Sequence, residues 1–508
     1  MIQAETMEEM LRIGGGLPKT SYILTVRELV RQNLRYFVFA ILAALALRAF
    51  FLLKFPHITD DSKIYADIAK NWLLNGVYGR TYDPGQIVPT DSRLPGYPAF
   101  LALVFAIFGI ENYRAVMVIQ VLADLGTCFV IADVARRSIC GRAAKAAFLL
   151  TGLCPFLAQY SAAALTETLE IFFTALALEF AAIGLNGLGS GQIRPWLQCG
   201  AAVAACILLR PDGGLLLAAF GMYFGILWLR AWRKHSEAAP PSPRVLSEVR
   251  LGIFPRRTQA TVPIVRAGLV LAAVALSPLT VWGARNVHTL HRWQFLAPRF
   301  ANEVEEFVPL GFNRWVSTWI ADYTSTEEVY WSVPGAKVDA SNLPARAFDS
   351  PEQKRQTLQL LDEYNNALNV SPELDARFAA LAEERIRAHP LRYYVILPAL
   401  KIADMWLRPR TEMLPPSSRW YEFDDDWKWI VLAVGLGVLN LIYVAAAIAG
   451  LIRGRPIAWA GLGISYIVLR SLFLGTMQNP ESRYTLECFP VVIWFASALW
   501  RHLTCETS

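Results

Sequence analysis

The sequence predicts an all-α protein that crosses the membrane many times, and composition and block length carry this prediction. The 508 residues are 55% hydrophobic and 18% charged, with a mean hydropathy of +0.34, whereas soluble domains contain about 25% charged residues. The apolar residues fall in blocks of about 20, the length that a helix needs to cross a bilayer core of about 30 Å. Because no water satisfies backbone groups there, each block should be helical.

The apolar blocks predict a bundle of about ten to twelve transmembrane helices. Arg210-Pro211-Asp212 interrupts one block, and the number of crossings between residues 94 and 145 stays open. The blocks cover residues 35–55, 94–110, 114–135, 143–160, 164–187, 197–232, 267–285, 429–452, 457–477 and 485–503.

The distribution of basic residues orients this bundle, because cytoplasmic loops carry excess Lys and Arg. Arg27, Arg31 and Arg35 precede the first block, and the segment 230–266 is basic and Pro-rich. We therefore expect both to lie in the cytoplasm. The predicted organisation is a cytoplasmic N-terminus (1–34), a membrane catalytic module (35–285) with an outer loop (56–93) and a cytoplasmic linker (230–266), an extracytoplasmic segment (286–428), and C-terminal transmembrane helices (429–508).

Several other functions are disfavoured by composition. Most of the formal charge of +6 lies in one linker, which argues against nucleic-acid binding. The seven cysteines form no CxxC pair, so neither a metal site nor a disulfide framework is predicted. About thirty mixed residues precede the first apolar block, and they do not resemble a signal peptide.

The first outer loop holds the most informative pattern, TDDSKIYADIAKNWLLNGVYG. Asp60 and Asp61 stand at the start of an amphipathic helix that Gly76 is suited to end. On pattern alone, the simpler interpretation is that Asp61 caps the helix. The alternative is that an acid just outside the membrane takes part in chemistry.

Further polar residues fall at the same predicted face. Each alone is typical of an interfacial anchor or a snorkelling side chain, yet ionisable groups at membrane depth usually line a cavity. Together they predict a site for an anionic, lipid-linked substrate. They are Arg93 just before LPGYP, Glu167 in ALTETLE, Arg210 at the Pro break, Arg285 before Asn286, Arg470 within an apolar block, and Glu481, Arg483 and Tyr484 just before the last block.

The long outer segment is predicted to contain a small helical cap. Ser350-Pro351-Glu352 and Ser371-Pro372-Glu373 both have the pattern of an N-cap, a first-position proline and a first-turn acid. Leu374, Phe378 and Leu381 fall on one face of the second helix. The aromatic-rich segment 391–407 is expected at the membrane interface or as a re-entrant helix.

The order of these motifs resembles the C-type (GT-C) glycosyltransferase superfamily. Asp61 and Tyr65 form a D-x-x-x-Y pattern, followed by NGVYG, RLPGYP, the Arg285-Asn286 exit, His389-Pro390 and ESRYTLECFP. The branch is that of dolichyl-phosphate-mannose–protein mannosyltransferases and lipid A aminoarabinose transferases, family 39-like. The family often has Asp-Glu where this chain has Asp60-Asp61-Ser62, and Lys-Pro-Pro or His-Pro-Pro near Arg93.

The resemblance implies an enzyme that moves a sugar from a polyprenyl phosphate to an acceptor hydroxyl outside the cytoplasm, with inversion. Asp61, with Asp60 beside it, would supply the base. Arg93, Arg483, Arg285 and Arg470 would bind the donor phosphate. Substrate would contact Tyr65, Glu167, Tyr97 and Tyr484.

The same resemblance implies a lipid-linked sugar and the bilayer as partners, an acceptor glycan, lipid or protein, no cofactor, no metal, and a bacterial inner membrane location. One rival is a polytopic lipid or glycan transporter or flippase, which predicts matching broken helices in two halves. A non-enzymatic receptor or assembly factor is another. The single Pro break at 210–212 has no clear partner, which favours the transferase.

Overall fold

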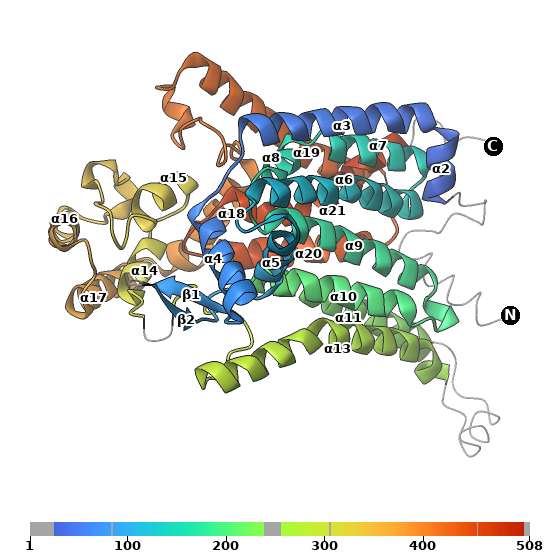
Figure 1. Cartoon of the computed structure of the whole chain (residues 1–508), viewed down its shortest axis with the longest axis horizontal. Coiled ribbons are helices and arrows are strands. Elements are labelled where there is room, and N and C mark those ends of the chain that lie inside the picture. The colour runs from blue at the N-terminus through green and yellow to red at the C-terminus, as the bar shows by residue number, and fades with distance from the viewer. Residues whose placement is uncertain (1–24, 83–84, 238–255, 304–305, 455, 502–508) are drawn as a thin grey trace. The chain divides into compact units, whose positions relative to one another are not determined.

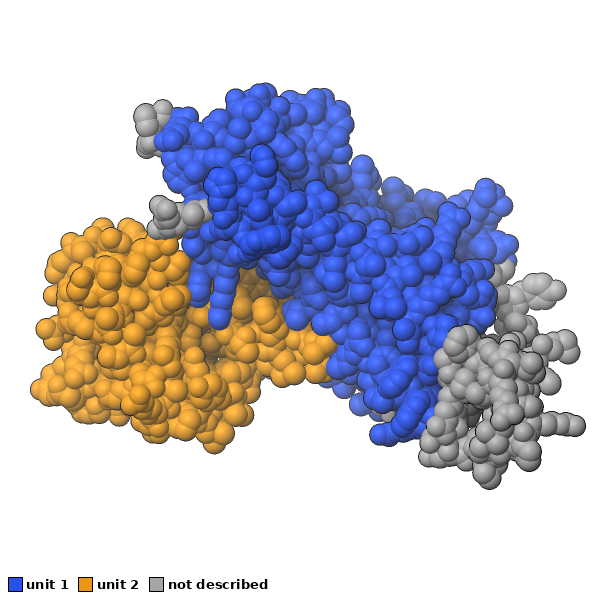
Figure 2. Space-filling model, turned by 90° about the horizontal axis from the view of Figure 1, so that it is seen from below, with its two compact units in different colours: residues 1–303, 443–467, 487–508 blue, residues 304–442, 468–486 orange. Residues whose placement is uncertain are grey.

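The computed structural model describes residues 25–82, 85–237, 256–303, 306–454 and 456–501. The chain divides into two compact units, which Figure 2 shows in different colours. The first unit contains residues 1–303, 443–467 and 487–508, and the second contains residues 304–442 and 468–486. The predicted cytoplasmic linker lies outside the described residues over 238–255, as does the N-terminus over 1–24.

Long helices that run side by side form the first unit (Figure 1). Among the described residues, α9 packs against α6 and α10, and α10 packs in turn against α13. The helix α3 packs on α6, α7 and α8. The helices are α2 (Val26–Gln32), α3 (Leu34–Lys54), α4 (Asp60–Asn75), α5 (Gly96–Phe108), α6 (Tyr113–Ser138), α7 (Gly141–Gly152), α8 (Pro155–Ser161), α9 (Glu167–Asn186), α10 (Arg194–Leu209), α11 (Gly214–Glu237), α13 (Arg256–Leu290) and α21 (Phe489–Ser497).

The described helices confirm the predicted fold class, a helical multi-pass membrane protein. Within that part of the chain, six helices are long and apolar enough to span a bilayer: 34–54, 113–138, 167–186, 211–233, 261–290 and 427–453. Three shorter apolar helices, at 96–108, 194–209 and 460–475, accompany them. The total of ten to twelve crossings therefore stays a prediction.

Two details of the first unit differ from the pattern-based expectation. The apolar block 143–160 forms two helices, because α7 ends at Gly152 and α8 begins with Pro155 in its first turn. A proline ring is tolerated at a helix start but not within it. The outer loop also contains an antiparallel hairpin of β1 (Gly79–Tyr82) and β2 (Gln86–Pro89), with Gly79 opposite Pro89.

A buried ion pair ties the first unit together. Arg48 of α3 and Asp124 of α6 lie 2.7 Å apart with side chains 0% and 2% exposed. Arg48 also donates to the carbonyl oxygens of Ala44, Gly152 and Thr151. Because every described contact of this guanidinium is with an acceptor from α3, α6 or α7, it fixes the spacing of three helices.

The second unit carries a helical subdomain with a core of large aromatic side chains. Ser350 and Ser371 cap α16 and α17, and each has the predicted proline in the first turn. Phe312, Trp315 and Phe378 pack together in the core. The elements are α14 (Leu310–Ser317), α15 (Tyr323–Ser325), α16 (Pro351–Ala367), α17 (Pro372–Ala388), a π-helical turn (Arg392–Ile396) and α18 (Leu397–Leu407), with α19 (Trp427–Arg453) and α20 (Ala460–Gly475) running through both units.

Candidate active site

The N-terminus of α4 places the two candidate acids. Thr59 is the N-cap: its hydroxyl accepts from the Ser62 amide at 3.3 Å, and the Ser62 hydroxyl accepts from the Thr59 amide at 3.0 Å. This reciprocal capping satisfies two amides without either aspartate. The simpler interpretation of Asp61 as the cap is therefore wrong, and Asp60 and Asp61 are the first two helical residues. Gly76 ends the helix as expected, with φ of +69°.

The two aspartates face different surroundings. Asp60 is 94% exposed, and its only described ion pair is with Lys63, at 2.9 Å. Asp61 is 37% exposed and accepts from Nη2 of Arg93 at 2.9 Å. Of the two acids, only Asp61 is thus turned toward another candidate site residue within the described chain.

Arg93 lies between Asp61 and a wall of tyrosines. Its guanidinium is 5.7 Å from the centre of the Tyr65 ring. The Tyr65 and Tyr97 rings pack in a T-shaped arrangement with their centres 5.1 Å apart. The Tyr97 hydroxyl donates to Gln120 at 2.8 Å. Burial raises the pKa of Tyr65 to about 12, so this phenol stays protonated and acts as a neutral group. The structure therefore brings together Asp61, Arg93, Tyr65 and Tyr97.

A close backbone approach sets the start of α5 beside the end of α10. A Cβ added at Gly96 would lie 2.6 Å from the carbonyl carbon and oxygen of Leu208. Only glycine fits this contact without a shift, which explains the glycine of RLPGYP. The contact places Tyr97, one residue later, next to the helix that ends at Arg210.

Glu167 belongs to a buried charged cluster in the same unit. Arg210 lies 3.1 Å from Glu167, 3.7 Å from Glu170 and 3.1 Å from Asp212. Glu167 and Glu170 are 1% and 0% exposed. Leu169, two residues after Glu167, and Leu209, next to Arg210, pack in one core cluster with Tyr65 and Tyr97, so the charged cluster adjoins the tyrosine wall. Sequence analysis singled out Glu167 and Arg210 but missed Glu170.

Arg285 lies beside the loop 56–93 and donates to Oδ1 of Asn286 at 2.9 Å and to two backbone carbonyl groups of the loop. It donates to the carbonyl oxygens of Thr90 at 2.8 Å and Tyr78 at 2.7 Å. The Tyr78 hydroxyl in turn donates to the carbonyl of Arg93 at 3.0 Å, and Trp282 lies under the guanidinium at 5.1 Å. This geometry suits a group that positions Arg93.

Two acids that the sequence did not highlight, one of them buried, also hold this loop. Asp91 is 0% exposed and accepts from Nε of Arg292 at 2.8 Å. Glu303 accepts from Thr90 at 2.7 Å and pairs with Arg80 at 3.3 Å. Nothing near Asp91 in the sequence distinguishes it from an ordinary turn residue, because its partner is about 200 residues away.

Three predicted residues belong to the second unit and form a cluster there. Nε of Arg470 donates to the carbonyl of Tyr484 at 2.8 Å. Arg483 pairs with Glu481 at 2.6 Å and lies over the Tyr484 ring at 5.3 Å. Arg410, which sequence analysis missed, donates to the carbonyl of Ser482 at 2.6 Å and to Thr485 at 2.7 Å, and so anchors this segment.

These observations define a class of protein. It is a polytopic helical membrane protein in which a carboxylate and a guanidinium are paired at the start of one helix. Residues 90–239 match a family model described as dolichyl-phosphate-mannose-protein mannosyltransferase. The match confirms the predicted resemblance for this region, and Arg93, Tyr97 and Glu167 lie within it. Asp61 lies before the matched region.

Comparison with known proteins adds structural similarities. No curated protein matches the chain. The chain is similar to the structure of the oligosaccharyltransferase AglB of Archaeoglobus fulgidus in complex with an inhibitory peptide and a dolichol-phosphate. The sequence identity is 13% and the TM-score is 0.43, and the similarity covers 92% of this chain and 50% of that one. It thus spans about half the length of that protein.

ArnT of Cupriavidus metallidurans is a second similar structure. In its apo state it has 14% identity and a TM-score of 0.35, over 93% of this chain and 77% of that one. Bound to undecaprenyl phosphate, it has 13% identity and a TM-score of 0.31, over 92% and 78%.

Proposed function

We propose that the protein is a glycosyltransferase that moves a sugar from a polyprenyl-phosphate donor to an acceptor hydroxyl outside the cytoplasm. The observation that carries the proposal is the contact of Asp61 with Arg93 at the start of α4, which pairs a proton acceptor with a phosphate-binding group. The description of the family that residues 90–239 match supports the lipid-linked donor class.

The chemistry assigned to Asp61 is that of a general base. The acceptor oxygen attacks the anomeric carbon, the bond from that carbon to the phosphate oxygen breaks, and its electron pair leaves with the lipid phosphate. The acceptor proton passes to the Asp61 carboxylate. Attack from the face opposite the leaving group inverts the anomeric centre. Asp61 is 37% exposed, so an acceptor from solvent can reach its carboxylate.

Arg93 is assigned to the leaving phosphate. A guanidinium presents parallel N–H donors that suit phosphate oxygens, and it cannot lose its proton. A donor phosphate at Arg93 competes with Asp61 for the same Nη2 donor. Donor binding would then release the carboxylate at the moment when it must accept a proton.

The remaining candidates take supporting roles in this scheme. Tyr65 and Tyr97 form the wall against the sugar, and Glu167 with Arg210 sets the electrostatic potential behind them. Arg285 positions Arg93 through the Tyr78 and Thr90 carbonyls. Arg470, Arg483 and Tyr484 stay predicted donor ligands, and Asp60 stays the alternative acid. A bacterial inner membrane is the proposed location.

A transfer assay tests the proposal. The purified chain would be incubated with a panel of polyprenyl-phosphate sugars and with protein, lipid and glycan acceptors, and the free polyprenyl phosphate would be measured. Release of lipid phosphate that depends on an acceptor and on Asp61 supports the proposal. A protein that leaves every donor intact but moves lipid between leaflets would instead be a flippase.

A further inference from the structure

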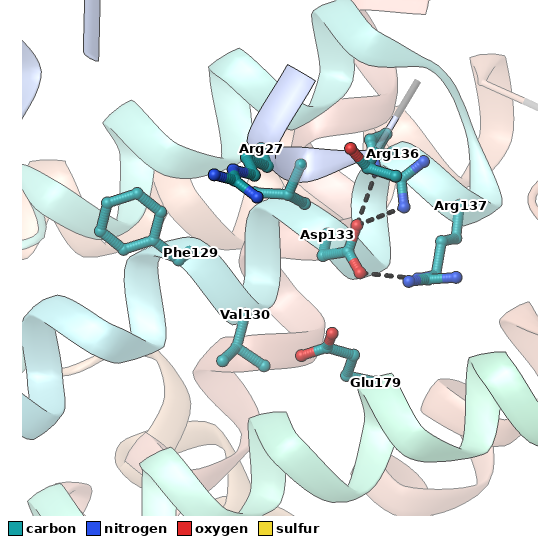
Figure 3. Close-up of a pocket in the computed structure, with 9 residues that line it drawn as sticks. Arg27, Phe129, Val130, Asp133, Arg136, Arg137 and Glu179 are labelled. Atoms are coloured by element: carbon teal, nitrogen blue, oxygen red, sulfur yellow. Dashed lines mark hydrogen bonds and ion pairs between the residues drawn. The ribbon is translucent and has the colours of Figure 1, made fainter. Parts of the chain in front are cut away.

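A polar pocket lies in the first unit, at the end of α3 that adjoins α2. The helix α3 has 21 residues between α2 and the segment that leads to Asp61, a separation of about 31 Å at 1.5 Å per residue. This pocket therefore cannot contact the candidate active site. Figure 3 shows its lining side chains.

The pocket has a volume of about 330 Å³, and apolar, basic and acidic side chains line it. Phe129 and Val130 of α6 form an apolar part, and Arg27, Arg136 and Arg137 form a basic part (Figure 3). An apolar wall next to a group of arginines is the combination that a phosphate on an apolar chain requires.

Local structure holds the arginines in place. Asp133 accepts from Nε of Arg136 and from Nε of Arg137, both at 2.6 Å. Its side chain is 6% exposed, so the carboxylate orients both guanidinium groups from within the protein. In the described part of the chain, nothing accepts from the terminal nitrogens of Arg137, and these remain available to a ligand.

Arg27 comes from a different helix and is held by a cap. Thr25 begins α2 with a reciprocal capping pair: its side chain accepts from the Glu28 amide, and Glu28 accepts from the Thr25 amide at 2.6 Å. The cap fixes the first turn, and Arg27 reaches the pocket from there (Figure 3). The basic wall thus joins the two helices α2 and α6.

The charge of the lining is positive whatever the state of its acids. Glu179 of α9 also lines the pocket and points toward Asp133 (Figure 3). With both acids ionised, three arginines oppose two carboxylates, and a proton on Glu179 increases the excess. The pocket therefore attracts anions in either state.

We propose that this pocket binds the phosphate group of an anionic lipid from the bilayer leaflet at the α2 end. The predicted topology makes this the cytoplasmic leaflet. The guanidinium groups of Arg27 and Arg137 bind the phosphate, and Phe129 and Val130 contact the glycerol and upper acyl region. A lipid, rather than soluble phosphate, is favoured because Phe129 and Val130 add an apolar surface beside the arginines, on a helix long and apolar enough to span a bilayer. The proposal is independent of transfer activity.

Lipid binding by the full-length protein tests the proposal. The protein in phosphatidylcholine nanodiscs would be titrated with phosphatidylglycerol, and bound lipid would be measured by native mass spectrometry. Arg27→Gln is the first variant, because Arg27 is exposed and its loss threatens folding little. We expect about five- to tenfold weaker binding, since one arginine near a lipid surface contributes about 1 kcal/mol or more. Arg137→Lys keeps the charge but loses the two-pronged contact and should weaken binding less.

Arg31→Gln is the matched control. Arg31 lies on the same helix, is exposed, and does not line the pocket. Equal weakening by Arg27→Gln and Arg31→Gln would mean that only the general surface charge attracts the lipid, which overturns the proposal. It is also overturned if inorganic phosphate displaces phosphatidylglycerol at matched concentration, because the occupant is then a soluble anion.

Discussion

Arg93 donates to Asp61 across 2.9 Å, although 32 residues separate them in the chain. The contact joins the first turn of α4 to Arg93, three residues before α5 begins at Gly96. It places a guanidinium and a carboxylate at one point, where the same nitrogen that serves Asp61 is suited to a phosphate. Both sides of the proposed reaction, proton removal and leaving-group binding, thereby depend on a single contact.

Asp61→Asn is the most direct test of the proposed base. The capping pair of Thr59 and Ser62 does not involve Asp61, so we expect the variant to fold with a normal melting temperature. Loss of a general base typically costs about 100- to 10,000-fold in rate. Turnover in the donor assay should fall by that amount.

Asp60→Asn is the matched control for this change. Asp60 has the same charge, lies one residue earlier and is 94% exposed. We expect near wild-type turnover. Loss of transfer in Asp60→Asn together with normal transfer in Asp61→Asn would assign the chemistry to the other acid.

Replacement of Arg93 should affect use of the donor. Arg93→Ala removes the guanidinium from the Asp61 contact, whereas Arg93→Lys keeps one charge without the two-pronged geometry. Charge-assisted hydrogen bonds contribute about 1.5–3 kcal/mol, and we expect kcat/KM for the donor to fall by about 10- to 150-fold in the alanine variant. The lysine variant should lie between alanine and wild type.

Arg483→Ala tests the predicted second phosphate ligand. Arg483 pairs with Glu481 in the second unit, and we expect its loss to weaken donor use as well. Arg314→Ala serves as a control, since this arginine of the same unit is half-exposed and pairs with Glu383. Unchanged donor kinetics in both Arg93→Ala and Arg483→Ala would make these arginines interfacial anchors.

Membrane topology is open to a direct measurement. Single cysteines at positions 240 and 340 would be labelled in intact cells with an impermeant maleimide. The basic segment 230–266 predicts protection at 240 and labelling at 340. The described native cysteines are buried or half-buried, which limits background labelling. Labelling at 240 with protection at 340 would invert the scheme and move the candidate site to the cytoplasmic face.

The sequence predicted local features of the site better than its long-range contacts. The helix from Asp60 to its glycine stop at Gly76 follows from apolar periodicity and capping preferences, as do the caps at Ser350 and Ser371. Such signals lie within a few residues of one another. The hairpin of β1 and β2 was missed because strands of four residues show too little alternation to distinguish them from a loop.

The sequence contains no local pattern that reveals the tertiary partners of the buried charged residues. The support of Arg93 by Arg285 passes through the Tyr78 carbonyl and hydroxyl, and the anchoring of the 482–485 segment comes from Arg410. Backbone carbonyls accept these bonds, and every residue has one. No residue type at the accepting positions therefore reveals the contact.

The buried pair of Arg48 and Asp124 predicts a large effect on stability. Removal of one partner from a buried ion pair leaves an uncompensated charge and typically costs about 3–5 kcal/mol. Asp124→Leu should therefore lower the melting temperature of the purified protein strongly. The double variant with Arg48→Met should recover much of the loss, and Lys63→Met, in an exposed pair, should change little.

Asp404 of α18 predicts how the stability of the second unit depends on pH. Burial raises the pKa of this carboxyl to about 6 from an ordinary 3.8, and its Oδ2 accepts from the Tyr323 amide at 3.0 Å. Since the folded state holds the proton more tightly than the unfolded state, the protein gives up stability as the pH rises from about 4 to about 6, and the loss is complete above the folded pKa. Asp404→Asn keeps an acceptor for the Tyr323 amide and removes the titration. The variant should match the wild type near pH 4 and melt at a higher temperature at pH 8.

Asp339 is the control, because its pKa shifts in the opposite direction. Hydrogen bonds from Ser341 lower the pKa of Asp339, so Asp339→Asn should not stabilise the protein at pH 8. Equal melting temperatures of wild type and Asp404→Asn across this range would show that Asp404 is ionised without cost in the folded protein.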